Sequence, residues 1–160
     1  NTSIIKTNFG RTIMVQWDET SPRPYTRLNL IQGTKGVLAG FPTRIAIENG
    51  FEGITKDHLT WVEGEAIEKV HEKYDHPLYK RLNKQSKNSG HGGMDGIMMY
   101  RIVECLREGL PLDQNVYEGA FWSSVTELSG NSIENGGAPQ KFPDFTRGNW
   151  RVTNPLNIIN

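Results

Sequence analysis

The chain has 160 residues, of which 36% are hydrophobic, and its 18 Lys plus Arg balance its 18 Asp plus Glu. This neutral balance argues against binding to nucleic acid or to an anionic membrane surface, because both need a basic excess. No apolar run approaches the roughly 18 residues of a membrane span. The single cysteine, Cys105, excludes an intrachain disulfide framework and a multi-cysteine metal site. The length predicts a single domain over residues 1–160.

The first third of the sequence predicts short strands. In residues 11–18, Ile13, Val15 and Trp17 alternate with more polar neighbours, which is the period of a half-buried strand. Further strands are predicted over residues 25–32, 37–41 and 44–48, with tight turns at Gly33–Gly36 and Asn49–Gly50. Four short strands with such connections favour one antiparallel sheet.

The remainder of the sequence predicts helices. A polar helix is expected over residues 63–74 and a shorter one over residues 78–87. The strongest helix carries an apolar stripe and ends at Gly109 and Pro111, and the stripe is Met94, Ile97, Met98, Ile102, Cys105 and Leu106. A last helix is expected to begin after Asp113 as its N-cap. The predicted fold class is therefore α+β, a mainly antiparallel β-sheet with helices packed on one face.

Several common catalytic motifs are absent from the sequence. It contains no dinucleotide glycine fingerprint, no phosphate-binding P-loop, no Gly-x-Ser-x-Gly nucleophile elbow and no His-Glu-x-x-His zinc pair. Asp95 and Asp144 are the acids that best suit a two-carboxylate glycosidase. Each also has a structural explanation, Asp95 as a charge at a helix start and Asp144 as the first residue of an Asx turn. The two-carboxylate reading therefore has the weaker support.

Two segments are candidates for binding. In the first, Pro24 stiffens the chain beside Tyr25, although the pattern favours a sheet aromatic as the explanation of this tyrosine. In the second, three glycines surround His91 just before a helix, where free backbone N–H groups can bind a polar ligand. The alternative for that segment is a flexible connector that happens to contain a histidine. Pattern alone does not separate the two readings.

A resemblance to a known family does bear on them. The block Arg23–Gly36 resembles the C-terminal half of bacterial glycoside hydrolase family 109, the NAD-dependent α-N-acetylgalactosaminidases. A second block, Gly90-His91-Gly92-Gly93-Met94-Asp95, is more specific, and it is followed by Glu104–Arg107, Gly109–Tyr117, Trp122–Ser124 and Pro143–Gly148. The resemblance covers most of the chain and is weakest across residues 50 to 88. The wider pattern is similar to the C-terminal domain of the Gfo/Idh/MocA oxidoreductases.

The resemblance implies a mechanism that depends on NAD. In that family the cofactor takes hydride from C3 of the sugar, a base removes the C2 proton, the leaving group at C1 is eliminated, water adds, and the hydride returns. The NAD-binding Rossmann domain and the residues thought to transfer protons lie N-terminal to the matching part. The resemblance therefore assigns no catalytic residue to this chain. It implies a substrate-binding role for Tyr25 and His91, and less firmly for Arg23 and Asp95. We expect Tyr25 and His91 to lie close together and to face one pocket.

Several expectations follow for the whole protein. The sequence starts at Asn1 without methionine or signal-peptide features, so we expect a piece of a longer protein, whose compartment stays open and includes export. The expected partners are a carbohydrate substrate, the protein's own Rossmann domain and a second copy bound through the sheet. Two alternatives remain: a sugar oxidoreductase of the wider superfamily, and a non-enzymatic sugar-binding or assembly module.

Overall fold

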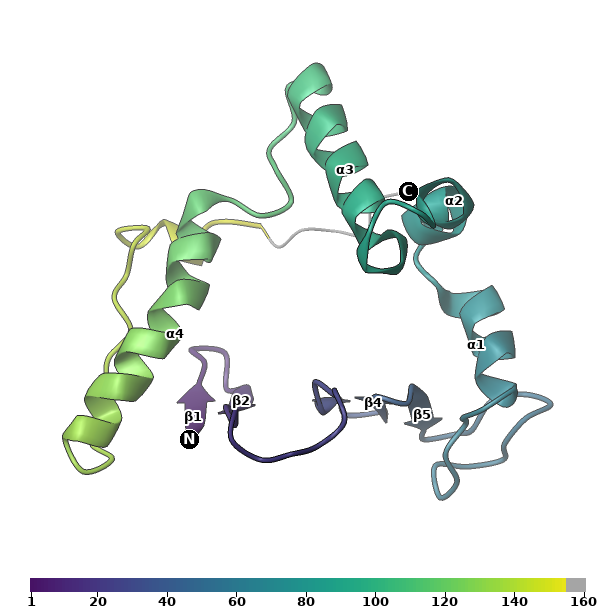
Figure 1. Cartoon of the computed structure of the whole chain (residues 1–160), viewed down its shortest axis with the longest axis horizontal. Coiled ribbons are helices and arrows are strands. Elements are labelled where there is room, and N and C mark those ends of the chain that lie inside the picture. The colour runs from purple at the N-terminus through teal and green to yellow at the C-terminus, as the bar shows by residue number, and fades with distance from the viewer. Residues whose placement is uncertain (155–160) are drawn as a thin grey trace. The chain divides into compact units, whose positions relative to one another are not determined.

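The computed structural model describes residues 1–154, and these form an α+β fold with antiparallel strands (Figure 1). The chain divides into two compact units. We call Glu19–Pro77 the sheet unit, and Asn1–Asp18 together with Leu78–Asn160 the hairpin–helix unit.

The sheet unit is a three-stranded antiparallel sheet with one helix. Its strands are β3 (Asn29–Gln32), β4 (Gly36–Gly40) and β5 (Arg44–Ile47), in that order, and its helix is α1 (Ala66–Tyr74). The apolar core of the unit joins the helix to the sheet and to the loop between them; its buried members are Phe51, Val62, Ile67 and Val70, with Ile45 and Ile47 of β5 packed against them. Helix α1 therefore covers one face at the β5 edge, as the α+β prediction requires.

The hairpin–helix unit contains a two-stranded hairpin and three helices. Strands β1 (Thr2–Lys6) and β2 (Thr12–Gln16) pair antiparallel. The helices are α2 (Pro77–Ser86), α3 (Met94–Glu108) and α4 (Val116–Glu134). A short 3-10 turn, η1 (His91–Gly93), lies directly before α3, and a second, η2 (Asn149–Arg151), follows α4. A hydrogen bond of 2.8 Å between the hydroxyls of Ser3 and Ser129 ties the hairpin to α4. Buried side chains of this unit include Leu78, Leu82 and Cys105.

The strand prediction needs two corrections. Strand β1 was missed, and it pairs with β2 to form a second small sheet in place of a single four-stranded one. The strand predicted over residues 25–32 is regular only from Asn29. Prolines 22 and 24 lack the N–H group that a sheet ladder needs, and Leu28 has a positive φ of 46°, so the chain enters β3 late.

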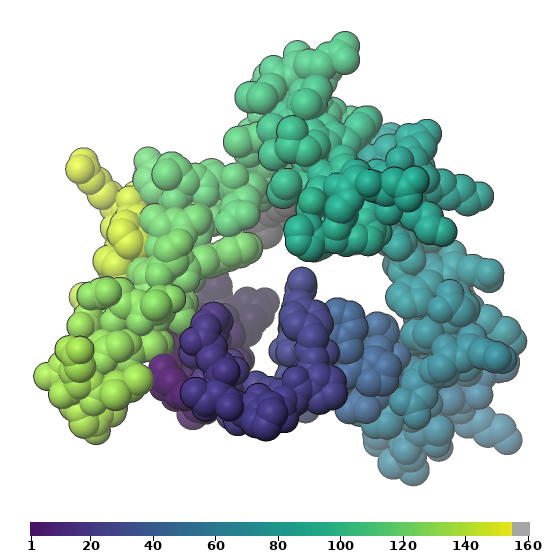
Figure 2. Space-filling view, in the orientation of Figure 1, coloured from purple at the N-terminus to yellow at the C-terminus, as the bar shows by residue number. Residues whose placement is uncertain are grey.

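The helix predictions hold in number and order, but two details differ. Helix α4 begins after Asn115, whose side chain accepts hydrogen bonds from the N–H groups of Tyr117 and Glu118, so the predicted N-cap at Asp113 was wrong. The apolar stripe of α3 is only partly buried within the chain: Cys105 is buried, but Met98 is 53% and Leu106 71% exposed. Helix α4 also has no fully buried residue, and its light-green side chains stand on the surface in Figure 2. The helices thus retain apolar surface that the chain itself does not bury.

Candidate functional site

Tyr25 lies in an exposed segment before β3, with its ring open to solvent. Its side chain is 78% exposed, and its hydroxyl oxygen accepts a hydrogen bond of 2.9 Å from Nε of Arg27. The ring also meets that of Phe41, with centroids 6.3 Å apart and planes tilted by 40°. Arg23, the weaker candidate of this segment, is exposed two residues earlier. The segment thus offers aromatic surface, a phenolic hydroxyl and two guanidinium groups to an approaching ligand.

His91 lies in a loop whose backbone is left-handed over four successive residues. Gly90, His91, Gly92 and Gly93 have φ angles of 94°, 46°, 70° and 102°. Glycine adopts such angles without steric cost, which explains why three of the four residues are glycines. Ser89 closes the loop, because its hydroxyl donates to the carbonyl of Ser86 at 2.6 Å and accepts from the N–H of Gly96 at 2.8 Å.

The loop brings His91 and Asp95 together. Nδ1 of His91 is 3.0 Å from each carboxylate oxygen of Asp95, which sits in the first turn of α3. The carboxylate fixes the orientation of the imidazole through Nδ1, and this leaves Nε2 for a ligand. The histidine side chain is 73% exposed, so that nitrogen is accessible. The pair can bind a hydroxyl group or exchange a proton with one.

Arg101, a buried arginine on α3, forms a charge network with two half-buried carboxylates that the sequence did not reveal. Its Nε and terminal nitrogen donate to the two carboxylate oxygens of Asp113 at 2.9 and 2.6 Å, and it also pairs with Glu104. The pKa of the Asp113 carboxyl is held below its usual value by this guanidinium. The pKa of Glu104 is lowered as well, first by the Tyr100 hydroxyl and then by Arg101. The network fixes the connection between α3 and α4 and explains why Asp113 is not the N-cap.

Asp144 forms the Asx turn that its sequence context predicts. One carboxylate oxygen accepts from the N–H and the hydroxyl of Thr146 at 3.0 and 2.7 Å, and the other accepts from the N–H of Gly148 at 2.8 Å. These bonds, led by that of the Thr146 hydroxyl, lower the pKa of the carboxyl. An ionised acid held in this way suits a structural role rather than that of a general acid.

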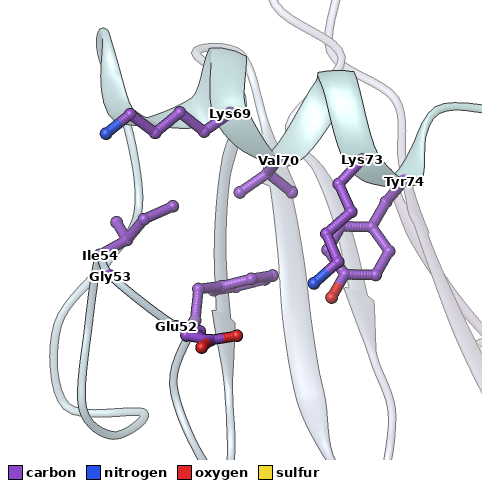
Figure 3. A pocket seen from close by; sticks show the side chains of 8 residues that line it. Glu52, Gly53, Ile54, Lys69, Val70, Lys73 and Tyr74 are labelled. Carbon is purple, nitrogen blue, oxygen red and sulfur yellow. The ribbon is translucent and has the colours of Figure 1, made fainter.

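A small hollow lies elsewhere, in the sheet unit between α1 and the loop that follows β5 (Figure 3). It encloses about 180 Å³ and is lined by Phe51, Glu52, Gly53, Ile54, Lys69, Val70, Lys73 and Tyr74. None of the four predicted site residues lines it. Among residues 1–154, no group of three or more His, Cys, Asp or Glu side chains could hold a metal ion. Within the same residues, no helix has both the length and the apolar character to cross a bilayer.

The structure therefore joins the predicted site residues in two groups. Tyr25 and Arg23 belong to the sheet unit, whereas His91 and Asp95 belong to the hairpin–helix unit. That Tyr25 and His91 face one pocket stays a prediction. Arg27 and Phe41 were missed as partners of Tyr25. An arginine two residues after an exposed tyrosine is a signal for Arg27, whereas Phe41 is distant in sequence and only the fold places it there.

Comparisons with known proteins agree on one family. The family model described as "Glycosyl hydrolase 109, C-terminal domain" matches residues 1–152. Glycosyl hydrolase family 109 proteins 1 and 2 of Akkermansia muciniphila are 63% and 58% identical to the chain, and the match covers 99% of it but 33% of each relative. A glycosyl hydrolase family 109 protein of Shewanella baltica is 54% identical over 99% of the chain and 34% of that relative. The chain thus spans about a third of the length of these relatives.

Proposed function

Because this chain belongs to the glycosyl hydrolase 109 C-terminal domain family, we propose that it supplies the sugar-facing surface of a glycoside hydrolase that removes terminal α-N-acetylgalactosamine. The family match over residues 1–152 is the observation that carries this proposal. The names of the similar proteins support the hydrolase class. The particular sugar is the finer part of the proposal and rests on the resemblance of the Arg23–Gly36 and Gly90–Asp95 blocks.

The proposed sugar contacts are the two groups described above. Tyr25 offers an exposed phenol, and His91 offers an exposed imidazole oriented by Asp95. A sugar presents several hydroxyl groups and apolar C–H faces, and sites for such ligands combine a few placed polar groups with aromatic surface. Arg23 is proposed as a further contact. These residues bind and orient the sugar, and they can exchange protons with its hydroxyl groups.

NAD does not fit the residues that the structure describes. A dinucleotide site needs parallel strands joined by a helix, with a glycine-rich turn against the pyrophosphate. The strand pairs in residues 1–154 are antiparallel. We therefore place NAD on a Rossmann domain of the longer protein, outside this chain, where it would supply redox chemistry. We place the catalytic residues there as well.

We also propose that two copies of the protein associate through the sheet. The support is apolar surface on the strands: Leu30 and Ile31 of β3 are 57% and 66% exposed. Isolated exposed side chains are ordinary, but adjacent ones on opposite faces of a short strand suit burial on both sides. Sedimentation velocity of the full-length protein tests this, since a monomer at high concentration would exclude the dimer.

The proposed activity is tested by hydrolysis of nitrophenyl α-N-acetylgalactosaminide. We expect the full-length protein to release nitrophenol without added NAD, and to act poorly on the matching α-galactoside, which lacks the N-acetyl group. The 160-residue chain alone is expected to be inactive. Reduction of added NAD with a free sugar and no release of nitrophenol would instead indicate a sugar oxidoreductase. Hydrolysis by the isolated chain would show that the site is complete within it.

A further inference from the structure

We propose that Arg27 and Phe41 complete a sugar-recognition cluster around Tyr25, in which Arg27 orients the Tyr25 hydroxyl and the Phe41 ring covers an apolar face of the sugar. The inference rests on the proposed function, because it assumes that Tyr25 faces the sugar. It goes further by assigning a positioning residue and a second contact residue. All three residues belong to the sheet unit, so the arrangement does not depend on the other unit.

The hydrogen bond between Arg27 and Tyr25 has a defined direction. A guanidinium group only donates, so Nε–H of Arg27 gives its hydrogen to the phenolic oxygen at 2.9 Å. Because Arg27 donates to the phenolic oxygen, the phenolic hydrogen cannot point toward the arginine. The hydroxyl is thereby turned to donate on the other side. A sugar hydroxyl or acetamide oxygen is the kind of acceptor that this donor selects.

The ring of Phe41 extends the surface beside that hydroxyl. Phe41 is 56% exposed, and its contact with Tyr25 is within the range of a stable aromatic pair. Two exposed rings in contact form a surface larger than either ring alone. The C–H face of a pyranose is apolar and of similar size, so burial on such a surface is favourable. We expect this contact to hold the substrate before and during the reaction, and therefore to act on KM.

A double-mutant cycle on the full-length protein tests the role of Arg27. Tyr25→Phe and Arg27→Met should each lower kcat/KM by about 3- to 10-fold, the range expected for one hydrogen bond. If Arg27 acts through the hydroxyl, the double variant loses no more than either single variant. Losses that multiply would overturn the positioning role. Arg11→Met, which removes an exposed arginine from the other unit, is the control and should leave kcat/KM unchanged.

A conservative pair of variants tests Phe41. Phe41→Leu removes the ring and should raise KM several-fold with kcat unchanged, whereas Phe41→Tyr keeps the ring and should restore KM. Two outcomes would overturn the contact: an equal fall of kcat in both variants, or a loss of thermal stability that parallels the loss of activity. Either would indicate that the cluster is buried against another domain.

Binding of N-acetylgalactosamine, measured by calorimetry, separates this inference from the proposed function. The wild-type protein could bind the sugar without hydrolysing the glycoside. If the effects of the substitutions at positions 25 and 27 on Kd were then non-additive in the same way, the cluster would be supported and the proposed reaction would be wrong. Full activity of Tyr25→Phe would remove Tyr25 as a sugar contact and overturn the cluster with it, while leaving the proposed reaction in place. If Tyr25→Phe lowered the activity but Arg27→Met and Phe41→Leu left it unchanged, the cluster alone would be overturned.

Discussion

The two units are held together by different interactions. In the sheet unit, α1 is joined to the sheet by apolar side chains, centred on Phe51 and Val62. In the hairpin–helix unit, α3 is joined to the connection that follows it by the ion pair between Arg101 and Asp113, and the side chains of α4 stay largely on the surface. The stability of the sheet unit should therefore fall when a buried side chain is shortened, and that of the hairpin–helix unit when a charge is removed or neutralised.

The two groups of candidate residues are also held in different ways. The loop of His91 is fixed by its own glycines and by Ser89, so its geometry is encoded locally. Tyr25 is held by one side-chain hydrogen bond and one ring contact, on a segment outside the regular strands. We expect the first group to keep its geometry in many contexts. The second group should depend more strongly on what binds to it.

The largest effect on stability should come from the apolar core of the sheet unit. Phe51 is 7% exposed and meets Tyr74 edge to face at 6.0 Å. Phe51→Ala should cost about 3–5 kcal/mol, because a buried aromatic ring leaves a cavity. Peptide-resolved hydrogen exchange should locate the loss in residues 19–77. Leu59→Ala, at a side chain that is 80% exposed, is the control and should have little effect.

Removing Arg101 should have the next largest effect on stability, and this effect should lie in the hairpin–helix unit. Arg101→Met leaves two carboxylates close together without their cation, and we expect a cost of about 1–3 kcal/mol because those carboxylates are partly solvated. Faster exchange confined to α3 and the start of α4 would agree with this. Arg107→Met, at an exposed position of the same helix, provides the comparison. Equal effects of the two substitutions would contradict a special role for the network.

Acid should weaken the hairpin–helix unit through Asp113. The pKa of this carboxyl is lowered in the folded protein, so its ion pair contributes stability above its ordinary pKa of about 4, and that stability is lost as the pH falls further. Denaturant unfolding between about pH 5 and about pH 3 should therefore show a steeper loss for the wild type than for Asp113→Asn. Identical slopes would mean that the ion pair does not differ between the folded and unfolded states.

Two glycine substitutions should act in opposite directions within one unit. A Cβ atom at Gly90 would lie 2.5 Å from a carboxylate oxygen of Asp95, at a φ of 94°, so Gly90→Ala should cost about 1–2 kcal/mol and separate Asp95 from His91. Gly119 lies inside α4 with open space around it, so Gly119→Ala should stabilise the helix by about 0.5–1 kcal/mol. Thermal unfolding measures both, and a shift of the same sign would contradict the backbone assignments.

The sequence predicted features that depend on neighbouring residues. Helix α3 ends at Gly109 in the left-handed conformation that its position suggested, and Asp144 forms the expected Asx turn. Strand β1 was missed because its alternation is weak: Ile4 and Ile5 are adjacent and the strand is short. Its pairing with β2 is what makes it a strand, and pairing is not visible in local periodicity.

The predictions that were wrong or missing concern contacts between residues that are distant in sequence. Asp113 looked like an N-cap, but Arg101, twelve positions earlier, takes its carboxylate, and Asn115 replaces it. Phe41 could not be linked to Tyr25 without the path of β3 and β4. The role of the Tyr25 and His91 segments in binding stays a prediction, whereas the pairing of His91 with Asp95 follows from their spacing of four across a helix start. Whether the two segments share one pocket stays a prediction.

The most direct test of the account is to measure turnover and bound NAD together in the full-length Tyr25→Phe variant. If this chain supplies the sugar-facing surface and another domain holds NAD, kcat/KM for nitrophenyl α-N-acetylgalactosaminide should fall by about 3- to 10-fold while the NAD content of the purified protein stays that of the wild type. Loss of NAD with the loss of turnover, or unchanged turnover, would contradict the assignment of Tyr25 to the sugar.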